Sequence, residues 1–169
     1  AGLAGKVVVI TGATQGIGLV VARRFGTLGA KVIINGRRAE AVNQAVTVLK
    51  REGITCSGVV ADAAREAGAE ALIAGAVSAF GDFDILVNNA AIAGPFSSAW
   101  DASAVDIDEI VRINFTGPVL CSTAAVRWLV AQGKQGRIIN VSSLVTEGNY
   151  PNFAHYSATK AALEAFTRS

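Results

Sequence analysis

The sequence predicts an α/β fold of the Rossmann type, a doubly wound parallel sheet between two layers of helices. Three observations predict it: short β-branched runs alternate with longer alanine-rich segments of helical period, the runs are apolar throughout, and the connections are short. Continuous apolar character is typical of strands covered on both faces. With 169 residues and 51% apolar content, we expect one folded domain over residues 1–169.

Strands and helices alternate along the whole chain. We expect strands at residues 6–11, 31–35, 55–61, 84–88 and 137–142, and helices at 16–28, 39–52, 65–80, 102–132 and from 153 onward. Right-handed crossovers then give the strand order 3-2-1-4-5, which leaves the fifth strand at an edge. Because that strand has no proline or inward-pointing charge to protect it, something outside the given sequence should cover it.

Composition excludes several classes of function. A formal charge of +2 is too small to predict a nucleic-acid surface, and no apolar run is long enough to cross a bilayer. The first residues lack the pattern of a signal peptide, so we expect a cytoplasmic protein. Cys56 and Cys121 lie in different predicted elements and, with one histidine, provide no metal-ligand spacing. We therefore expect two buried free thiols and no metal.

The stretch TGATQGIG, residues 11–18, joins the first strand to the first helix. Its glycines allow a sharp turn, the close approach of a diphosphate and tight packing of the helix, whose N-terminus offers free N–H groups. The loop predicts a dinucleotide site made by Gly12, Thr14, Gln15, Gly16, Ile17 and Gly18. A tight turn without a ligand is the alternative.

The end of the second strand reads INGRR, residues 34–38. An acidic residue about 20 positions beyond the glycine loop would bind the ribose of NAD, but Gly36 stands there, followed by Arg37 and Arg38. The missing carboxylate removes repulsion against a 2′-phosphate, and a guanidinium binds such a phosphate through paired hydrogen bonds. These residues predict NADP in preference to NAD. The alternative is a pair of solvated arginines before a helix.

Tyr156 and Lys160 share one face of the last predicted helix. A lysine ammonium at about 4 Å, with an effective dielectric of about 20, favours the phenolate by roughly 4 kcal/mol. Tyr156 would then be a useful proton donor at neutral pH. A tyrosine and a lysine at this spacing are also common on helix surfaces that have no function.

Two further polar groups fall near the same end of the sheet. Ser143 follows the fifth strand at the rim where open α/β sheets bind ligands, so its hydroxyl could reach a substrate carbonyl, although serines there also form turns. Asn114 lies four residues before Pro118, which has no N–H to donate. Pro118 should release the Asn114 carbonyl to hold a water, with Gly117 easing the bend, unless the kink has no function.

These stretches, with NNAA at 88–91, VSS at 141–143 and YSATK at 156–160, occur in an order that resembles the short-chain dehydrogenase/reductase family. The chain looks like the compact branch that includes β-ketoacyl-acyl-carrier-protein reductases and many carbonyl reductases. It implies an NADP-dependent oxidoreductase that transfers hydride between the cofactor and a carbonyl or secondary alcohol. It also implies a homo-oligomer, a dimer or a tetramer.

The resemblance also implies roles for single residues. Tyr156 would be the acid/base, assisted by Lys160, which would also hold the nicotinamide ribose. Ser143 would polarise the carbonyl, and Asn114 would hold a water that relays protons. The remaining cofactor contacts would be Asp62 at the adenine amino group and Asn89 and Ala90 along the cofactor.

Two features depart from the family pattern. Ala91 stands where the family usually has glycine, which we expect to be tolerated if Ala91 keeps a negative φ. The strands, cofactor loop and substrate lid that follow the YxxxK helix in the family are missing after Ser169. We therefore expect a truncated version of the family fold, whose activity alone is open.

Other functions remain possible at this stage. The chain could be an NADP-binding module without catalysis, or an assembly domain whose open edge is completed by a partner. An extended epimerase or dehydratase shares the tyrosine and lysine, but its glycine loop typically has the spacing T-G-x-x-G-x-x-G. For a small ketone or alcohol substrate, Leu144, Tyr150 and Phe153 indicate an apolar pocket wall.

Overall fold

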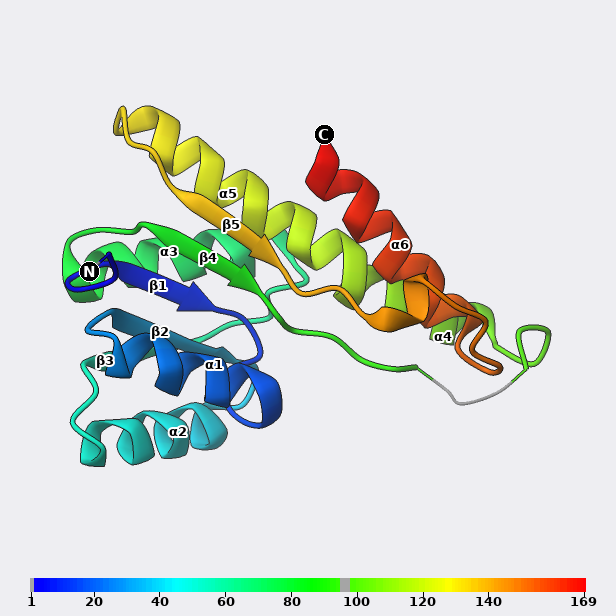
Figure 1. Ribbon diagram of the computed structural model, residues 1–169, viewed down its shortest axis with the longest axis horizontal. Helices are drawn as coiled ribbons and strands as arrows, with labels where there is room; N and C mark the ends of the chain where they lie inside the picture. The colour runs from blue at the N-terminus through cyan, green and yellow to red at the C-terminus, as the bar shows by residue number, and fades with distance from the viewer. Residues whose placement is uncertain (1, 95–97) are drawn as a thin grey trace.

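The computed structural model describes residues 2–94 and 98–169 and has a single parallel sheet at its centre (Figure 1). Its strands lie in the order β3-β2-β1-β4-β5, as predicted. In register, Val9 of β1 pairs with Ile33 of β2 and Leu86 of β4. The strand bounds are β1 Val7–Ile10, β2 Lys31–Gly36, β3 Cys56–Val60, β4 Ile85–Asn88 and β5 Arg137–Asn140.

Apart from α5, which is the second part of the helix predicted over residues 102–132, the helices begin within two residues of the predicted positions. Their bounds are α1 Gly16–Thr27, α2 Ala39–Arg51, α3 Glu66–Phe80, α4 Ala104–Val111, α5 Gly117–Ala131 and α6 Ala154–Arg168. A short 3₁₀ turn, Leu144–Thr146, lies between β5 and α6. Within the described ranges, no helix is both long enough and apolar enough to span a membrane.

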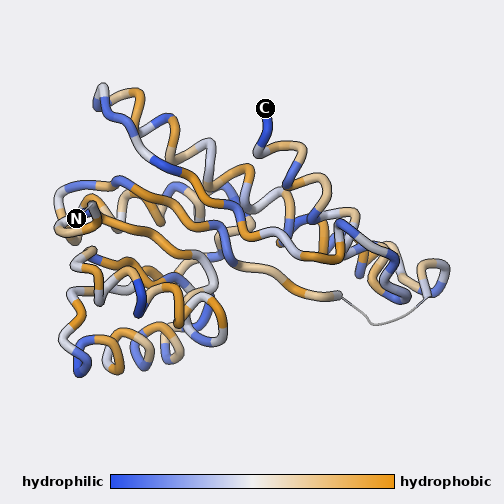
Figure 2. Tube along the Cα trace, viewed as in Figure 1, coloured by the Kyte–Doolittle hydropathy of each residue, from blue (hydrophilic) through white to orange (hydrophobic). Residues whose placement is uncertain are grey.

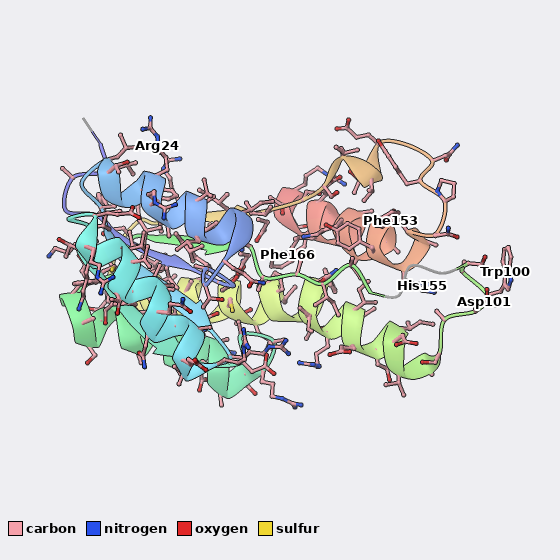
Figure 3. All side chains as sticks on the ribbon, turned by 90° about the horizontal axis from the view of Figure 1, so that it is seen from below. Arg24, Trp100, Asp101, Phe153, His155 and Phe166 are labelled. Carbon is pink, nitrogen blue, oxygen red and sulfur yellow. The ribbon has the colours of Figure 1, made fainter. Side chains whose placement is uncertain are left out.

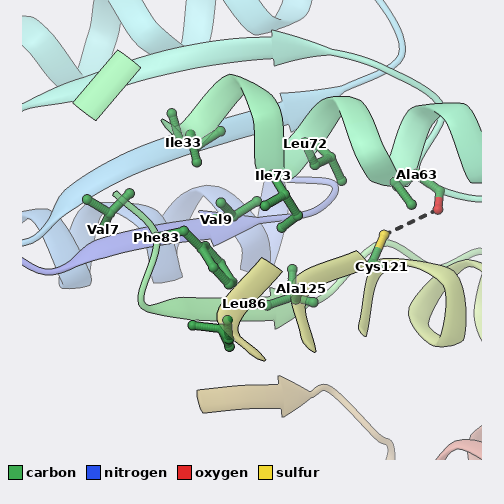
Figure 4. Packing of buried hydrophobic residues seen from close by; sticks show 13 residues of the cluster. Val7, Val9, Ile33, Ala63, Leu72, Ile73, Phe83, Leu86, Cys121 and Ala125 are labelled. Atoms are coloured by element: carbon green, nitrogen blue, oxygen red, sulfur yellow. Dashed lines mark hydrogen bonds between the residues drawn. The ribbon is translucent and has the colours of Figure 1, made fainter. Parts of the chain in front are cut away.

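Alternate side chains of the strands face two separate layers of helices. Val8, Val32 and Ile85, which are paired in register, pack with α1 and α2. The opposite row of Val9, Ile33 and Leu86 packs with α3 and α5 (Figure 4). Figure 2 shows the strands as a largely hydrophobic band, in agreement with burial on both faces.

The predicted helix over residues 102–132 is divided by a π-helical turn, Arg112–Thr116. In this turn the Gly117 N–H donates to the carbonyl of Arg112, five residues back. Pro118 follows at once and has no N–H to donate. We attribute the wider turn to this missing donor. The segment therefore stays helical, where we expected a bend. The turn carries Asn114 into the interior, where it is fully buried.

Two predictions about exposure are confirmed. β5 lies at the edge of the sheet, and the side chain of Ile139 is 42% exposed. Cys56 and Cys121 are buried free thiols. The Cys121 thiol donates to the carbonyl of Ala63 at 3.4 Å and thereby joins α5 to the segment after β3 (Figure 4).

Candidate active site

One cleft of about 890 Å³ lies across the carboxyl ends of the strands, where the order of the sheet reverses between β1 and β4. It brings together the glycine loop, the end of β2 and the start of α6. Leu144, Tyr150 and Phe153, predicted as an apolar pocket wall, are not among the residues that line this cleft. Of the predicted catalytic and cofactor-binding residues, Asn114 alone does not line it. The others all do: Gly12, Thr14, Gln15, Gly16, Ile17, Gly18, Arg37, Arg38, Asp62, Asn89, Ala90, Ser143, Tyr156 and Lys160.

The glycines of the loop are required for different reasons. A Cβ on Gly12 would lie 2.9 Å from the Cα of Ala90, and Gly12 has φ +62°. A Cβ on Gly18 would lie 2.5 Å from the carbonyl oxygen of Gly12. Gly16 has open space around it but a φ of +55°. Gly12 and Gly18 therefore permit close packing within the protein, while Gly16 permits the turn and leaves its backbone open to a ligand.

Thr11 joins the glycine loop to the segment after β4, a role that the sequence analysis missed. Its hydroxyl oxygen accepts the N–H groups of Asn89 and Ala90, both at 3.0 Å. The Asn89 amide in turn donates to the carbonyls of Thr11, at 2.9 Å, and Gly12, at 3.2 Å. Ala91 follows in this segment; among the described residues, Asn152 is the only non-glycine with positive φ. Ala91 thus keeps the negative φ on which its tolerance depends.

Asn35 is a second residue that the sequence analysis missed. It is buried at the end of β2, where its side-chain oxygen accepts the Gly12 N–H at 3.4 Å. Its amide donates to the carbonyls of Val59 and Ala61, at 3.2 and 3.0 Å. One side chain thereby fixes the glycine loop relative to β2 and the end of β3. The available signal was a polar residue within an otherwise apolar strand.

The rim of the cleft beside β2 is positively charged. Arg37 and Arg38 are exposed, and among the described residues neither forms an ion pair. Gly36 lies against the loop, since a Cβ there would be 2.6 Å from the Cγ2 of Thr14. This position therefore has no room for an acidic side chain unless Thr14 moves.

Asp62 lies on the cleft after β3 and is held by its neighbours. One carboxylate oxygen accepts the Ala64 N–H at 3.1 Å. The other lies 3.3 Å from Nη1 of Arg112 and 3.5 Å from Nε of Arg65. The side chain is 31% exposed, so it still contributes an acceptor to the cleft wall.

Tyr156 and Lys160 share one face of α6, as predicted. The Lys160 ammonium lies 5.7 Å from the centre of the Tyr156 ring and donates to the carbonyl of Val141 at 2.7 Å. Lys160 is 2% exposed, and this burial lowers the pKa of its ammonium. The Val141 contact fixes the lysine between α6 and the segment that follows β5.

The two serines after β5 have different environments. The Ser142 hydroxyl donates to the carboxylate of Glu164 on α6. Ser143 begins the 3₁₀ turn, and its oxygen accepts the Val145 N–H at 3.5 Å. Within the described part of the chain, the Ser143 hydroxyl has no acceptor for its own hydrogen. Ser143 is therefore the serine with a donor available to the cleft.

Asn114 lies behind the cleft wall. Its side-chain oxygen accepts the Ile92 N–H and its amide donates to the Ile92 carbonyl, both at 2.8 Å. The amide also lies 3.3 Å from the Thr159 hydroxyl, next to Lys160 on α6. The side chain thus connects three segments around the site. That the Asn114 backbone carbonyl holds a water remains a prediction.

The model of a protein family described as short chain dehydrogenase matches residues 6–169. The chain belongs to the short-chain dehydrogenase family. A curated member, dehydrogenase/reductase SDR family member 4 of Homo sapiens, is 36% identical over 167 residues, which are 99% of this chain and 60% of that protein. The chain therefore spans about 60% of the length of this relative.

Solved structures of short-chain dehydrogenases share the fold. A short chain dehydrogenase from Mycobacterium smegmatis superposes with a TM-score of 0.94 at 31% identity, over 98% of this chain and 70% of its own. A metagenomic short-chain oxidoreductase in complex with NADP gives 0.90 at 29% identity, over 99% and 76%. NAD⁺-bound xylitol dehydrogenase gives 0.92 at 30% identity, over 99% and 64%. The last two each bind a nicotinamide cofactor.

Proposed function

We propose that this chain forms the cofactor site and the proton-transfer site of an NADP-dependent oxidoreductase that interconverts a ketone and a secondary alcohol. The observation that carries the proposal is the continuity of the cleft. The glycine loop, the two arginines Arg37 and Arg38, and the group of Ser143, Tyr156 and Lys160 line the same cavity. A nucleotide and a small substrate would therefore meet within it.

The residues of the glycine loop fit a diphosphate. α1 begins after Gln15 without a side-chain cap and has no acidic residue in its first turn. Its first N–H groups and the positive end of its dipole are thus available to an anion. The open space beside Gly16 supports the same assignment. Thr14 and Ile17, which flank this turn on the cleft, would contact the nucleotide.

The rim residues favour NADP. Arg37 and Arg38 are exposed, unpaired cations within the described ranges, suited to bind a 2′-phosphate. Thr14 occupies the space that an acidic residue at position 36 would need to bind the ribose of NAD. Asp62, Asn89 and Ala90 would complete the nucleotide contacts.

Proton transfer is assigned to side chains of this chain. The bound nicotinamide supplies or accepts the hydride at the carbonyl carbon. In the direction of reduction, the Tyr156 hydroxyl donates a proton to the carbonyl oxygen; in the direction of oxidation, Tyr156 takes that proton back. The Ser143 hydroxyl, which has no acceptor for its hydrogen among the described residues, would donate to the same oxygen and stabilise the charge that develops on it.

Lys160 supports Tyr156 and the cofactor in this scheme. One N–H of its ammonium is bound to Val141, which leaves two donors for a ribose hydroxyl or a relay water. Its positive charge beside the Tyr156 ring favours the phenolate that remains after proton donation. A water held by the Asn114 carbonyl would return a proton from solvent through Lys160.

A second function is supported by the open edge of the sheet. β5 has no neighbour on its outer side among the described residues, and Ile139 is 42% exposed. Such an edge fits a nucleotide-binding fragment that a partner or a further segment completes before it becomes active.

The exposed side chains of Val126 and Val130 on α5, at 47% and 72%, support the homo-oligomer that the family resemblance implies.

Titration with NADPH and with NADH, followed by nicotinamide fluorescence, tests the cofactor assignment. We expect tighter binding of NADPH than of NADH. Replacing Arg37→Ser and Arg38→Ser together should weaken NADPH binding about tenfold or more and leave NADH binding unchanged. The control is Arg24→Ser, because Arg24 is exposed on α1 and projects away from the cleft (Figure 3). Equal affinities for both nucleotides would overturn the preference.

A further inference from the structure

Glu164 of α6 binds the segment that carries Ser143. One oxygen of its carboxylate, Oε1, accepts hydrogen bonds from the Ser142 hydroxyl and from the Thr146 hydroxyl, the latter at 2.8 Å. The Thr146 hydroxyl also lies 2.9 Å from the carbonyl of Ser143. A single carboxylate oxygen therefore holds residues on both sides of Ser143.

Glu164 shares a helix face with the proton-transfer pair. It lies four residues after Lys160 and eight after Tyr156, a spacing that places all three along one side of α6. Lys160 adds a third contact with the same segment through the carbonyl of Val141, at 2.7 Å. Residues 141–146 are thus fastened to α6 at Val141, Ser142 and Thr146. Hydrogen bonds from Ser142 and Thr146 lower the pKa of Glu164, so the carboxylate is ionised at neutral pH.

The structure assigns Glu164 as a positioning residue that sets Ser143 opposite Tyr156. This inference rests on the proposed function, in which both hydroxyls bind one carbonyl oxygen. Ser143 belongs to a turn after β5 and Tyr156 belongs to α6, so their separation depends on contacts between the two elements. Small displacements of reacting groups reduce rates strongly. Glu164 does not line the cleft, so it acts through Ser143.

Two substitutions of Glu164 distinguish the effect of its hydrogen bonds from the effect of its negative charge. Glu164→Gln keeps an acceptor oxygen for both hydroxyls and removes the charge, whereas Glu164→Ala removes both. Thr146→Val removes one of the two hydrogen bonds to Glu164, together with the contact to the Ser143 carbonyl, with little change in shape. The matched control is Glu147→Ala, because Glu147 is an exposed carboxylate in the same stretch of chain.

Hydrogen exchange of residues 142–147 measures the positioning without any turnover. We expect exchange to become about tenfold faster in Glu164→Ala, to rise less in Thr146→Val, and to stay at the wild-type rate in Glu164→Gln and Glu147→Ala. Wild-type exchange in Glu164→Ala would overturn the inference. If Glu164→Ala does not fold, wild-type exchange in Thr146→Val would overturn it. Fast exchange in Glu164→Gln would also overturn it, since the charge would then be the essential feature.

Steady-state kinetics of ketone reduction adds a readout that a purely structural residue would not move. We expect kcat to fall about tenfold in Glu164→Ala with NADPH affinity unchanged, and to recover in Glu164→Gln. An unchanged kcat in Glu164→Ala would contradict the inference even where exchange is faster. Failure of the proposed function has a different signature, which is undiminished turnover in Tyr156→Phe.

Discussion

Asn114 and Ile92 are joined by two hydrogen bonds of 2.8 Å each, one donated by the Asn114 amide and one accepted by its side-chain oxygen. This pairing resembles that of two backbone peptides and connects the π-helical turn to the segment after β4. Asn114 is fully buried and Ile92 is partly buried, so removing the Asn114 side chain would leave the Ile92 N–H and carbonyl without their protein partners.

Replacing Asn114→Ala should therefore destabilise the fold. The Ile92 N–H and carbonyl would lose their partners, at a cost of about 1–3 kcal/mol each. We expect the free energy of unfolding, measured in urea, to fall by about 2–4 kcal/mol. Asn149→Ala serves as the control, because Asn149 is exposed. A loss within about 0.5 kcal/mol of that control would show that the pairing is not structural.

Lys160→Met should change how stability depends on pH. Burial lowers the pKa of Lys160 below its ordinary value of 10.5. Between the lowered value and 10.5, the unfolded state binds more protons than the folded state, so wild-type stability rises with pH across that window. Below the window both states carry the proton, and the folded state bears the full cost of burying the charge.

The measurement is urea unfolding of wild type and Lys160→Met near neutral pH and at about pH 10. Methionine does not titrate, so the stability of the variant relative to wild type should be greater near neutral pH than at the higher pH. A difference that is independent of pH, or that has the opposite sign, would contradict the buried ammonium.

The two thiols should be unreactive in the folded protein. Burial raises the pKa of Cys121 to about 12 and also raises the pKa of Cys56. Since the thiolate is the reactive form, iodoacetamide at about pH 8 should modify neither residue before unfolding and both after it. Mass spectrometry counts the added groups. Rapid modification of Cys121 in the folded protein would mean that solvent reaches its thiol through the cleft, which Cys121 and Ala63 both line.

Thr14 and Gly36 should control cofactor choice together. A Cβ at position 36 would lie 2.6 Å from Cγ2 of Thr14 but 3.7 Å from its Cβ, so Thr14→Ala removes the closest contact and leaves Cγ2 of Val42, at 3.2 Å, to shift slightly. We expect Gly36→Asp alone to weaken both NADPH and NADH, and Gly36→Asp with Thr14→Ala to favour NADH. Thr14→Ala alone should keep the preference for NADPH. NADH preference in Gly36→Asp alone would show that Thr14 moves freely.

The sheet and most of the helices could be predicted because they depend on local pattern. Apolar runs such as residues 7–10 are typical of a strand covered on both faces. Pro118 marked the correct site of the irregularity in the long helix. The contacts of Asn114 within that turn could not be predicted, because its partners Ile92 and Thr159 are distant in sequence.

Leu144, Tyr150 and Phe153 were wrongly expected to line the pocket. Most of the polar and glycine residues that face the cleft were predictable, because the ends of parallel strands meet at one edge of the sheet. The residues that hold them in place were not. Thr11 binds Asn89, which is 78 positions away, and Glu164 binds Ser142, which is 22 positions away. No local motif relates such partners. Asp62 was placed correctly on the cleft, while its ion pair with Arg112 depended on the packing of the π-helical turn.

The central claim is that Tyr156 transfers the proton in a site that binds NADPH. Its most direct test is ketone-dependent oxidation of NADPH by wild type and by Tyr156→Phe, with NADPH affinity measured on both proteins. Phenylalanine keeps the ring beside Lys160 and removes only the hydroxyl. We predict that turnover falls by about 10²–10⁴-fold while NADPH affinity is unchanged. Turnover at the wild-type rate in Tyr156→Phe would contradict the account.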